Sequence, residues 1–302
     1  MTGPEPPGAG IVWCASYPKS GNTWMRALLG AAIGGGEVDI NRLEGAVHVS
    51  HPLLFDELAL SVSALGMADV EPLLRLVDRR VAARATTPVL RKLHDAHLPG
   101  PDGAPRVLAG PTRLVVYVVR DPRAVAVSWA HHLGTTQAVA VEVMRTPIGV
   151  GGVAPSDWVA EAGTYRLGTW SDHVRSWLDE DGLPVVVVRY EELRREPHRE
   201  LRRVLDAARL QVDDRTVAAA VEASSFETML IQELLGGFLE APRAGVPFFR
   251  RGDADAWRDE LRPDLIREVE RDHGDVMHRL GYQPLAGSTS AAPQQATGED
   301  VR

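Results

Sequence analysis

Two lysines and one histidine are the residues with the clearest potential for chemistry in this chain. Only two of its 33 basic residues are lysines, Lys19 and Lys92, and His94 follows the second lysine by two positions. A lysine offers a compact, rotatable ammonium where an arginine offers a broad planar fork. Histidine changes protonation near neutral pH and therefore suits proton transfer. The two lysines either mark sites that need an ammonium or survive by chance in an arginine-biased composition.

Lys19 lies in a stretch that predicts an anion-binding loop. An apolar, strand-like run begins at Ile11 and breaks at Pro18, and residues 23–33 have a helical pattern. A strand that turns into a helix presents backbone N–H groups and the positive end of a helix dipole, which favour phosphate. The loop lacks the Gly-x-x-x-x-Gly that precedes the lysine of a Walker A sequence, which weakens the case for an ordinary ATP site. A plain Pro–Gly turn is the alternative.

The positioning elements are buried strands that alternate with helices. Apolar runs follow at 88–93, 114–119 and 183–189, and this order predicts an α/β fold. We expect a single domain with a central, mainly parallel sheet flanked by helices and a P-loop-like strand-loop-helix phosphate site. Ligands bind beyond the carboxyl ends of such strands. The residues just past them, expected to converge at one edge, are Lys19, His94, Arg120 and Tyr190.

The other segments are assigned by periodicity and turn residues. Helices are expected at 123–133, 156–179, 197–208, 213–223 and 263–280, with a mostly helical segment at 38–87. The helix at 156–179 carries aromatic residues that we assign to the core. Loops or irregular segments are expected at 134–155 and from Phe226 to Phe249.

Composition restricts the class of protein. The 302 residues are 44% hydrophobic and 25% charged, with a net charge of −8, which disfavours a general nucleic-acid surface. No apolar run approaches the roughly 20 residues of a membrane span, and no signal peptide is evident. The single cysteine, Cys14, excludes an intrachain disulfide and is interpreted as a buried structural thiol. We therefore expect a cytoplasmic protein.

Six motifs in order resemble those of the sulfotransferases that use 3′-phosphoadenosine 5′-phosphosulfate (PAPS). They run from about residue 11 to 282, which predicts a domain at 11–284 between disordered ends at 1–10 and 285–302. One departure is Asn22, where the family has Thr. The motifs are Tyr-Pro-Lys-Ser-Gly-Asn-Thr-Trp at 17–24, Lys-Leu-His at 92–94, the segment from Tyr117 to Ser128, Tyr-Glu-Glu-Leu at 190–193, Ser-Ser-Phe at 224–226, and Phe-Arg-Arg-Gly at 249–252.

The resemblance implies a set of donor-binding residues. The 5′-phosphate would be held by Lys19 and the amides of Ser20, Gly21, Asn22 and Thr23. Arginine forks suit a fixed dianion, and the 3′-phosphate would contact Arg120, Ser128, Arg250, Arg251 and the Gly252 amide. The adenine would contact Trp24, Tyr190, Ser224 and Phe226.

The implied reaction transfers a sulfuryl group to the hydroxyl of a small molecule, for which a bacterial natural product is our expectation. His94 would be the general base, with Lys19 at the bridging oxygen and Lys92 at the sulfuryl group. His97 is a reserve candidate for the base, and His131 and His132 either face the acceptor or lie at the surface. The scheme needs no metal.

Two other functions remain open at this point. A small-molecule kinase and a catalytically silent nucleotide-binding protein are the alternatives, and a homodimer is left open.

Overall fold

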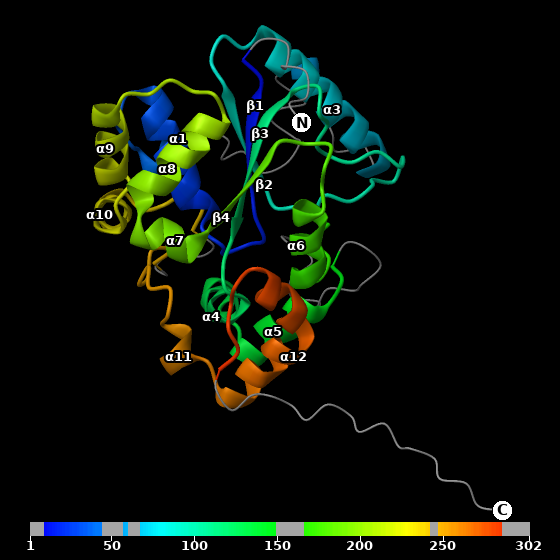
Figure 1. The fold of residues 1–302 in the computed structure, drawn as a ribbon, viewed down its shortest axis with the longest axis vertical. Coiled ribbons are helices and arrows are strands. Elements are labelled where there is room, and N and C mark those ends of the chain that lie inside the picture. The colour runs from blue at the N-terminus through cyan, green and yellow to red at the C-terminus, as the bar shows by residue number, and fades with distance from the viewer. Residues whose placement is uncertain (1–8, 44–56, 60–66, 149–165, 242–246, 286–302) are drawn as a thin grey trace, which may run out of the picture.

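A four-stranded parallel sheet organises the computed structural model, which describes residues 9–43, 57–59, 67–148, 166–241 and 247–285. The strands are β1 (Ile11–Ala15), β2 (Val89–Leu93), β3 (Thr112–Val119) and β4 (Val185–Arg189), in the order β2-β1-β3-β4. All pairings are parallel, so the carboxyl ends of the strands lie at one edge (Figure 1). The expected single α/β domain with a parallel sheet is confirmed.

Helices cover both faces of the sheet. One face packs against α1 (Asn22–Gly34), α8 (Pro197–Ala207) and α9 (Asp214–Ala223). The opposite face packs against α4 (Pro122–Leu133), α5 (Gln137–Arg145), α6 (Trp170–Leu178) and α12 (Pro263–Arg279). The remaining elements are a 3₁₀ turn η1 (Ile40–Arg42), α3 (Met67–Arg84), α7 (Tyr190–Arg195), α10 (Phe226–Gly236) and α11 (Trp257–Glu260).

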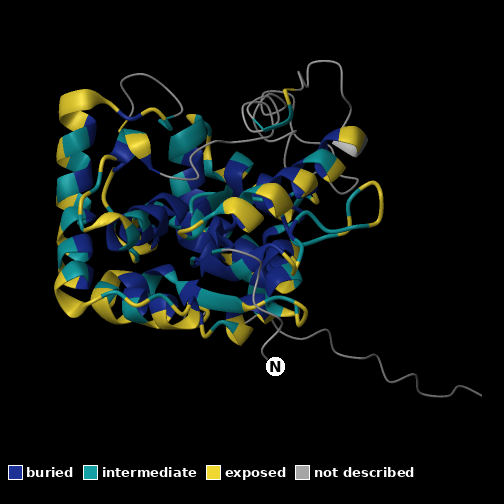
Figure 2. Ribbon diagram, turned by 90° about the horizontal axis from the view of Figure 1, so that it is seen from above, coloured by how far each residue is buried: buried dark blue, intermediate teal, exposed yellow. Residues whose placement is uncertain are grey.

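Alternation along the central strands explains the two layers. Trp13 and Tyr117 point into the core on the α4 side, whereas Cys14 and Val116 point into the core on the α1 side. Both sets are buried, as the continuous apolar runs predict (Figure 2). Burial of the Cys14 thiol is thus confirmed, and burial raises its pKa to about 12, although the nearby Arg26 lowers it.

Two helices lie where the sequence predicts loops. Helix α5 occupies part of the segment 134–155, with a Thr136 side chain that caps its first turn and buried apolar residues on one face. Helix α10 occupies the first part of the segment that begins at Phe226, capped by Ser225. Exposed leucines on α10, at Leu234 and Leu235, obscure its amphipathic period. The loop prediction is wrong for α5, and the prediction of less regular structure from Phe226 is wrong for α10.

Two other boundaries differ from expectation. Helix α6 begins at Trp170, because Gly168 adopts a positive φ of 64° and Thr169 caps the first turn, so residues 166–169 are not helical. Residues 156–165 of the helix predicted at 156–179 lie outside the described residues, as do residues 44–56 and 60–66 of the segment 38–87 and the chain ends at 1–8 and 286–302. Strand β4 is half-buried, not fully buried, because it forms an edge of the sheet.

Within the described ranges, no helix is both long enough and apolar enough to cross a membrane.

Candidate active site

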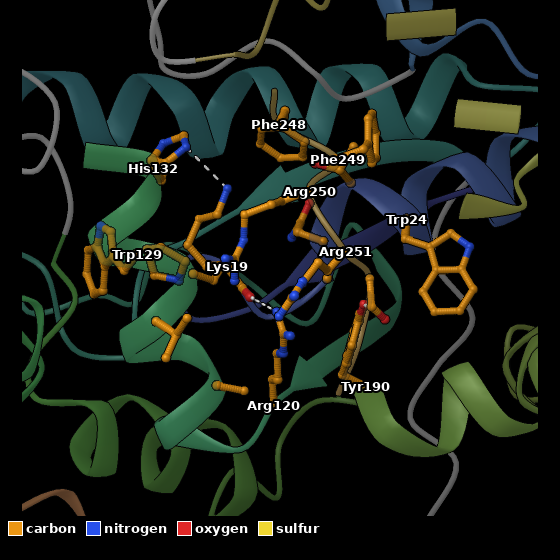
Figure 3. A pocket seen from close by; sticks show the side chains of 18 of the residues that line it. Lys19, Trp24, Arg120, Trp129, His132, Tyr190, Phe248, Phe249, Arg250 and Arg251 are labelled. Atoms are coloured by element: carbon orange, nitrogen blue, oxygen red, sulfur yellow. Dashed lines mark hydrogen bonds between the residues drawn. The ribbon is translucent and has the colours of Figure 1, made fainter. Parts of the chain in front are cut away.

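A cavity of about 630 Å³ lies beyond the carboxyl ends of the strands. It is lined by Lys19, His94, Arg120 and Tyr190, each of which follows a different strand, so the expected convergence is confirmed. Figure 3 shows Lys19 and His132 pointing toward one another, with Arg120 and the later arginines beside them. The cavity size is typical of a ligand site. The other predicted residues that line it are Gly21, Asn22, Thr23, Trp24, Lys92, Ser128, Phe226, Arg250, Arg251 and Gly252.

The loop before α1 is built to receive an anion. Lys19 adopts a left-handed backbone with φ of 65°, which is uncommon for a residue with a side chain. Gly21 is the N-cap of α1 and has no side chain, so it offers no acceptor to the N–H groups of the first turn. The first turn also carries no acidic residue. The positive end of this helix is therefore available to a phosphate.

Substitution of Gly21 tests the geometry of this loop. Gly21 has φ of 108°, and an added Cβ would lie 2.7 Å from the Tyr190 ring. We expect Gly21→Ala to lower the free energy of unfolding by about 1–3 kcal/mol through backbone strain and overpacking. Gly30→Ala is the matched control on the same helix, because a Cβ there meets nothing within 4 Å. It should be neutral or stabilising, by up to about 1 kcal/mol. Urea denaturation distinguishes them, and equal effects would contradict the assignment.

Aromatic side chains form the wall next to this loop. The Trp24 and Tyr190 rings meet edge to face at a centroid distance of 5.9 Å. The Tyr190 hydroxyl donates to the Gly252 carbonyl at 3.2 Å, and Gly252 approaches the Phe226 ring so closely that a Cβ would lie 2.6 Å from it. Three rings around a close backbone approach make a surface on which a flat heterocycle can stack.

Arginines supply the positive charge of the cavity. The Arg120 guanidinium donates to the backbone carbonyl of Asp253 at 3.0 Å and lies 4.3 Å from the Tyr190 ring centroid. Arg250 and Arg251 both pair with Glu260, at 2.7 and 2.8 Å. Burial raises the pKa of Glu260, but the two arginines lower it below its ordinary value. Glu260 therefore stays ionised and holds both guanidinium groups at the cavity.

Hydrogen bonding at His94 selects its tautomer. Nδ1 of His94 lies 2.8 Å from the carbonyl oxygen of Ser16, directly after β1, and 3.3 Å from the hydroxyl of the same residue. A carbonyl only accepts, so Nδ1 carries the proton and donates it. Nε2 then carries the lone pair that a general base requires. Asn22, the departure from the family pattern, donates to the Cys14 carbonyl at 2.7 Å and thereby fixes the end of the same strand.

A buried histidine, His173, holds the backbone of His94 in place. Nε2 of His173 lies 3.0 Å from the His94 carbonyl, so it donates, and its Nδ1 accepts from the Tyr117 hydroxyl at 2.9 Å. Burial lowers the pKa of His173 to about 4, partly countered by the bond to His94. His173 therefore remains neutral at physiological pH and keeps both hydrogen bonds.

The two lysines have defined partners. Lys19 Nζ lies 3.2 Å from Nδ1 of His132 and 3.9 Å from the centroid of the Phe248 ring. Lys92 Nζ lies 2.8 Å from Oε2 of Glu240. Both lysines line the cavity together with His94. Two ammonium groups and an imidazole therefore meet in one cavity, an arrangement that suits the transfer of a charged group between two bound substrates.

Some candidates lie elsewhere. Ser20 and Ser224 are buried but do not line the cavity; the Ser224 hydroxyl donates to the Ala220 carbonyl at 2.5 Å, whereas the Ser20 hydroxyl has no partner among the described residues. His97 also lies outside the cavity lining, and its Nε2 is 3.0 Å from Glu180. His131 is absent from the main cavity, whereas His132 lines it.

Sequence reasoning did not single out Phe248, Glu240 or Glu260, each of which contacts a predicted site residue. The position of Phe248 could have been predicted, since it directly precedes the Phe-Arg-Arg-Gly motif. Glu240 and Glu260 contact their partners only through the fold, and their positions carry no local signal. Over the described part of the chain, no group of three or more His, Cys, Asp or Glu side chains could hold a metal ion.

Comparisons with known proteins agree with this fold. Mouse sulfotransferase 1B1 is 25% identical over 262 residues, which cover 82% of this chain and 76% of the mouse protein. Cytosolic sulfotransferase 12 of Arabidopsis thaliana is 29% identical over 266 residues, covering 84% and 73%. The crystal structure of mouse sulfotransferase SULT7A1 complexed with PAP has the same fold, with a TM-score of 0.56, 18% identity and coverage of 90% and 86%.

A second solved structure has the same fold, and a model of a whole protein family matches the sequence. Retinol dehydratase in complex with androsterone and the inactive cofactor PAP superposes with a TM-score of 0.55 at 18% identity, covering 96% of this chain and 84% of that one. The sequence model described as "Sulfotransferase domain" matches residues 10–281, which is most of the chain. The chain belongs to the sulfotransferase-domain family.

Proposed function

We propose that this protein transfers the sulfuryl group of PAPS to a hydroxyl of a small molecule. The observation that carries the proposal is the contact between Nδ1 of His94 and the Ser16 carbonyl, in one cavity with two lysines. That arrangement supplies a base and two cations for a reaction in which negative charge moves to a leaving phosphate.

The donor half of the cavity has the chemistry that PAPS requires. The open N-terminus of α1 and Lys19 suit the 5′-phosphate, and the buried Ser20 hydroxyl lies in the same loop. Arg120, Arg250 and Arg251 suit the 3′-phosphate, with Ser128 as a hydroxyl donor. The rings around Gly252 suit the adenine. Solved relatives of the same fold were determined with PAP, which supports this donor.

The reaction follows from these roles. The acceptor oxygen forms a bond to sulfur while its proton passes to Nε2 of His94. The bond from sulfur to the bridging oxygen breaks, and its electron pair stays on the 5′-phosphate of the leaving PAP. Lys19 stabilises the charge that develops on that oxygen, and Lys92 stabilises the sulfuryl oxygens.

The acceptor half of the cavity is apolar. Its wall includes Trp129, Leu133, Leu167 and Phe248, which favour a hydrophobic acceptor that offers one hydroxyl to His94. Retinol dehydratase was solved with retinol and with androsterone, two apolar alcohols, which supports this class. A bacterial natural product of this kind is our proposed acceptor. Mass spectrometry of phenols and other hydroxyl compounds incubated with PAPS identifies it by the added sulfuryl mass.

Nucleotide preference tests the donor assignment without an acceptor. At 100 times its Kd, PAP should stabilise the protein by about 2.7 kcal/mol. For a domain of this size the melting temperature should then rise by roughly 4–6 °C. ATP at the same concentration should raise it much less, because it lacks a 3′-phosphate for Arg120 and its partners. A larger shift with ATP would overturn the proposal in favour of a kinase. Binding of PAP without transfer to any acceptor would favour a silent nucleotide-binding protein.

A further inference from the structure

Three charged side chains, Arg26, Glu240 and Lys92, are linked in series through the wall of the cavity. Oε1 of Glu240 lies 2.6 Å from Nη2 of Arg26, and Oε2 lies 2.8 Å from Nζ of Lys92. Each carboxylate oxygen thus takes one cation. The side chains of Arg26, Lys92 and Glu240 are 0%, 9% and 16% exposed, so little water competes for these contacts. Such charge-assisted hydrogen bonds are stronger than those between neutral groups.

The three residues come from distant elements. Arg26 is on α1, Lys92 is near the end of β2, and Glu240 follows α10. The segment with Glu240 is anchored independently, because Phe238 is buried against Phe249 in a small apolar cluster. The carboxylate is therefore held from its own side as well as by its partners.

Arg26 is committed to Glu240. Its side chain is fully buried, and among the described residues its Nε and Nη1 atoms have no hydrogen-bond partner. A buried guanidinium without a carboxylate is costly. Burial raises the pKa of Glu240, but the Lys92 ammonium and the Arg26 guanidinium lower it below its ordinary value. Glu240 is therefore ionised, and the three side chains together carry one net positive charge.

We infer that Glu240 is a positioning residue that fixes the Lys92 ammonium at the reaction centre, with Arg26 as its buried anchor. The inference deepens the proposed function, since it rests on the assignment of Lys92 to the sulfuryl group. A lysine ammonium ends a flexible four-carbon stem, and a single 2.8 Å contact to a fixed carboxylate removes much of that freedom. Arg26 offsets the negative charge that Glu240 would otherwise present to an anionic donor.

The scarcity of lysine allows a direct test that needs no acceptor. A full-length chain grown with ¹³C-lysine gives side-chain NMR signals from only Lys19 and Lys92. Lys19→Arg and Lys92→Arg assign them. The Cε shift follows protonation of the ammonium, and a carboxylate within hydrogen-bond distance favours the protonated form. In Glu240→Gln the Lys92 midpoint should fall by about 1–3 pH units. The Lys19 midpoint should stay close to that of the wild type, because Lys19 contacts His132 and Phe248.

Two variants control for charge and for folding. Glu227→Gln removes the same charge from an exposed position in the first turn of α10 and should leave the Lys92 midpoint unchanged. Glu240→Asp keeps the carboxylate and should return the midpoint toward the wild-type value. An unchanged midpoint in Glu240→Gln, or an equal shift in Glu227→Gln, would overturn the inference.

Kinetics with 2-naphthol as a probe acceptor complete the test. Glu240→Gln should lower kcat by about 10- to 100-fold, the scale expected when a reacting group is misplaced. The Kd for PAP should change less than twofold, because Glu240 bonds to Arg26 and Lys92, and neither of these is assigned to a phosphate of PAP. Transfer at the wild-type rate in Glu240→Gln would refute the positioning role. Absence of transfer in the wild type would count against the proposed function alone, since the NMR titration decides the Glu240–Lys92 contact independently.

Discussion

Replacement of His94 by alanine is expected to lower kcat by about 10²- to 10⁴-fold, the contribution typical of a general base. The reason is geometric: Nδ1 donates to the Ser16 carbonyl, so Nε2 is the nitrogen that we assign to take the proton of the acceptor. Binding of PAP should change little, because the groups assigned to its phosphates lie on the α1 loop and on the arginines. Calorimetric titration with PAP and steady-state rates with 2-naphthol measure the two effects.

Arg120→Ala is the matched control for this separation. Its guanidinium lies between the Lys19 and Asp253 carbonyls and over the Tyr190 ring. Loss of charged hydrogen bonds, each contributing about 1.5–3 kcal/mol, should weaken PAP binding by at least about 10-fold. The division of roles would be refuted if both variants lost PAP affinity equally, or if His94→Ala retained the wild-type kcat.

Residues at strand ends were the predictable part of this site. Lys19, His94, Arg120 and Tyr190 each follow an apolar run, and parallel strands bring their carboxyl ends to one edge. The central strands were also predictable from the sequence, because burial on both faces of a sheet requires an uninterrupted apolar run. These features depend on short stretches of chain, and the structure confirms them. The functional roles of the four residues remain predictions.

Contacts between distant segments were the part that sequence could not supply. Arg26 and Glu240 are separated by 214 positions, and no periodicity links them. Glu260 reaches Arg250 and Arg251 only because α11 turns the chain back toward the cavity. Helix α10 was missed for a different reason: a helix that exposes several leucines lacks the apolar stripe by which helices are identified. The ion pairs of Glu240 and Glu260 are therefore recognised only in the folded structure.

The strongest test of the two-lysine pattern is Lys19→Arg, which keeps the charge and changes its shape. The Lys19 ammonium lies 3.2 Å from His132 and 3.9 Å from the Phe248 ring centroid, a space that suits a compact group. A planar guanidinium spreads its charge over a wider fork. We expect kcat to fall by about 10²- to 10³-fold, the loss typical when one group that stabilises the transition state is removed.

Lys19→Met separates charge from shape in the same measurement. It should lose kcat to at least the same extent, and it should also weaken PAP binding, because the 5′-phosphate loses its ammonium. Lys19→Arg should retain most of that binding, since the positive charge is kept. If Lys19→Arg transferred the sulfuryl group at the wild-type rate, the lysine would be an accident of an arginine-rich composition. Loss of rate with retained affinity would instead show that the reaction requires an ammonium at this position, where a guanidinium cannot follow the charge on the bridging oxygen.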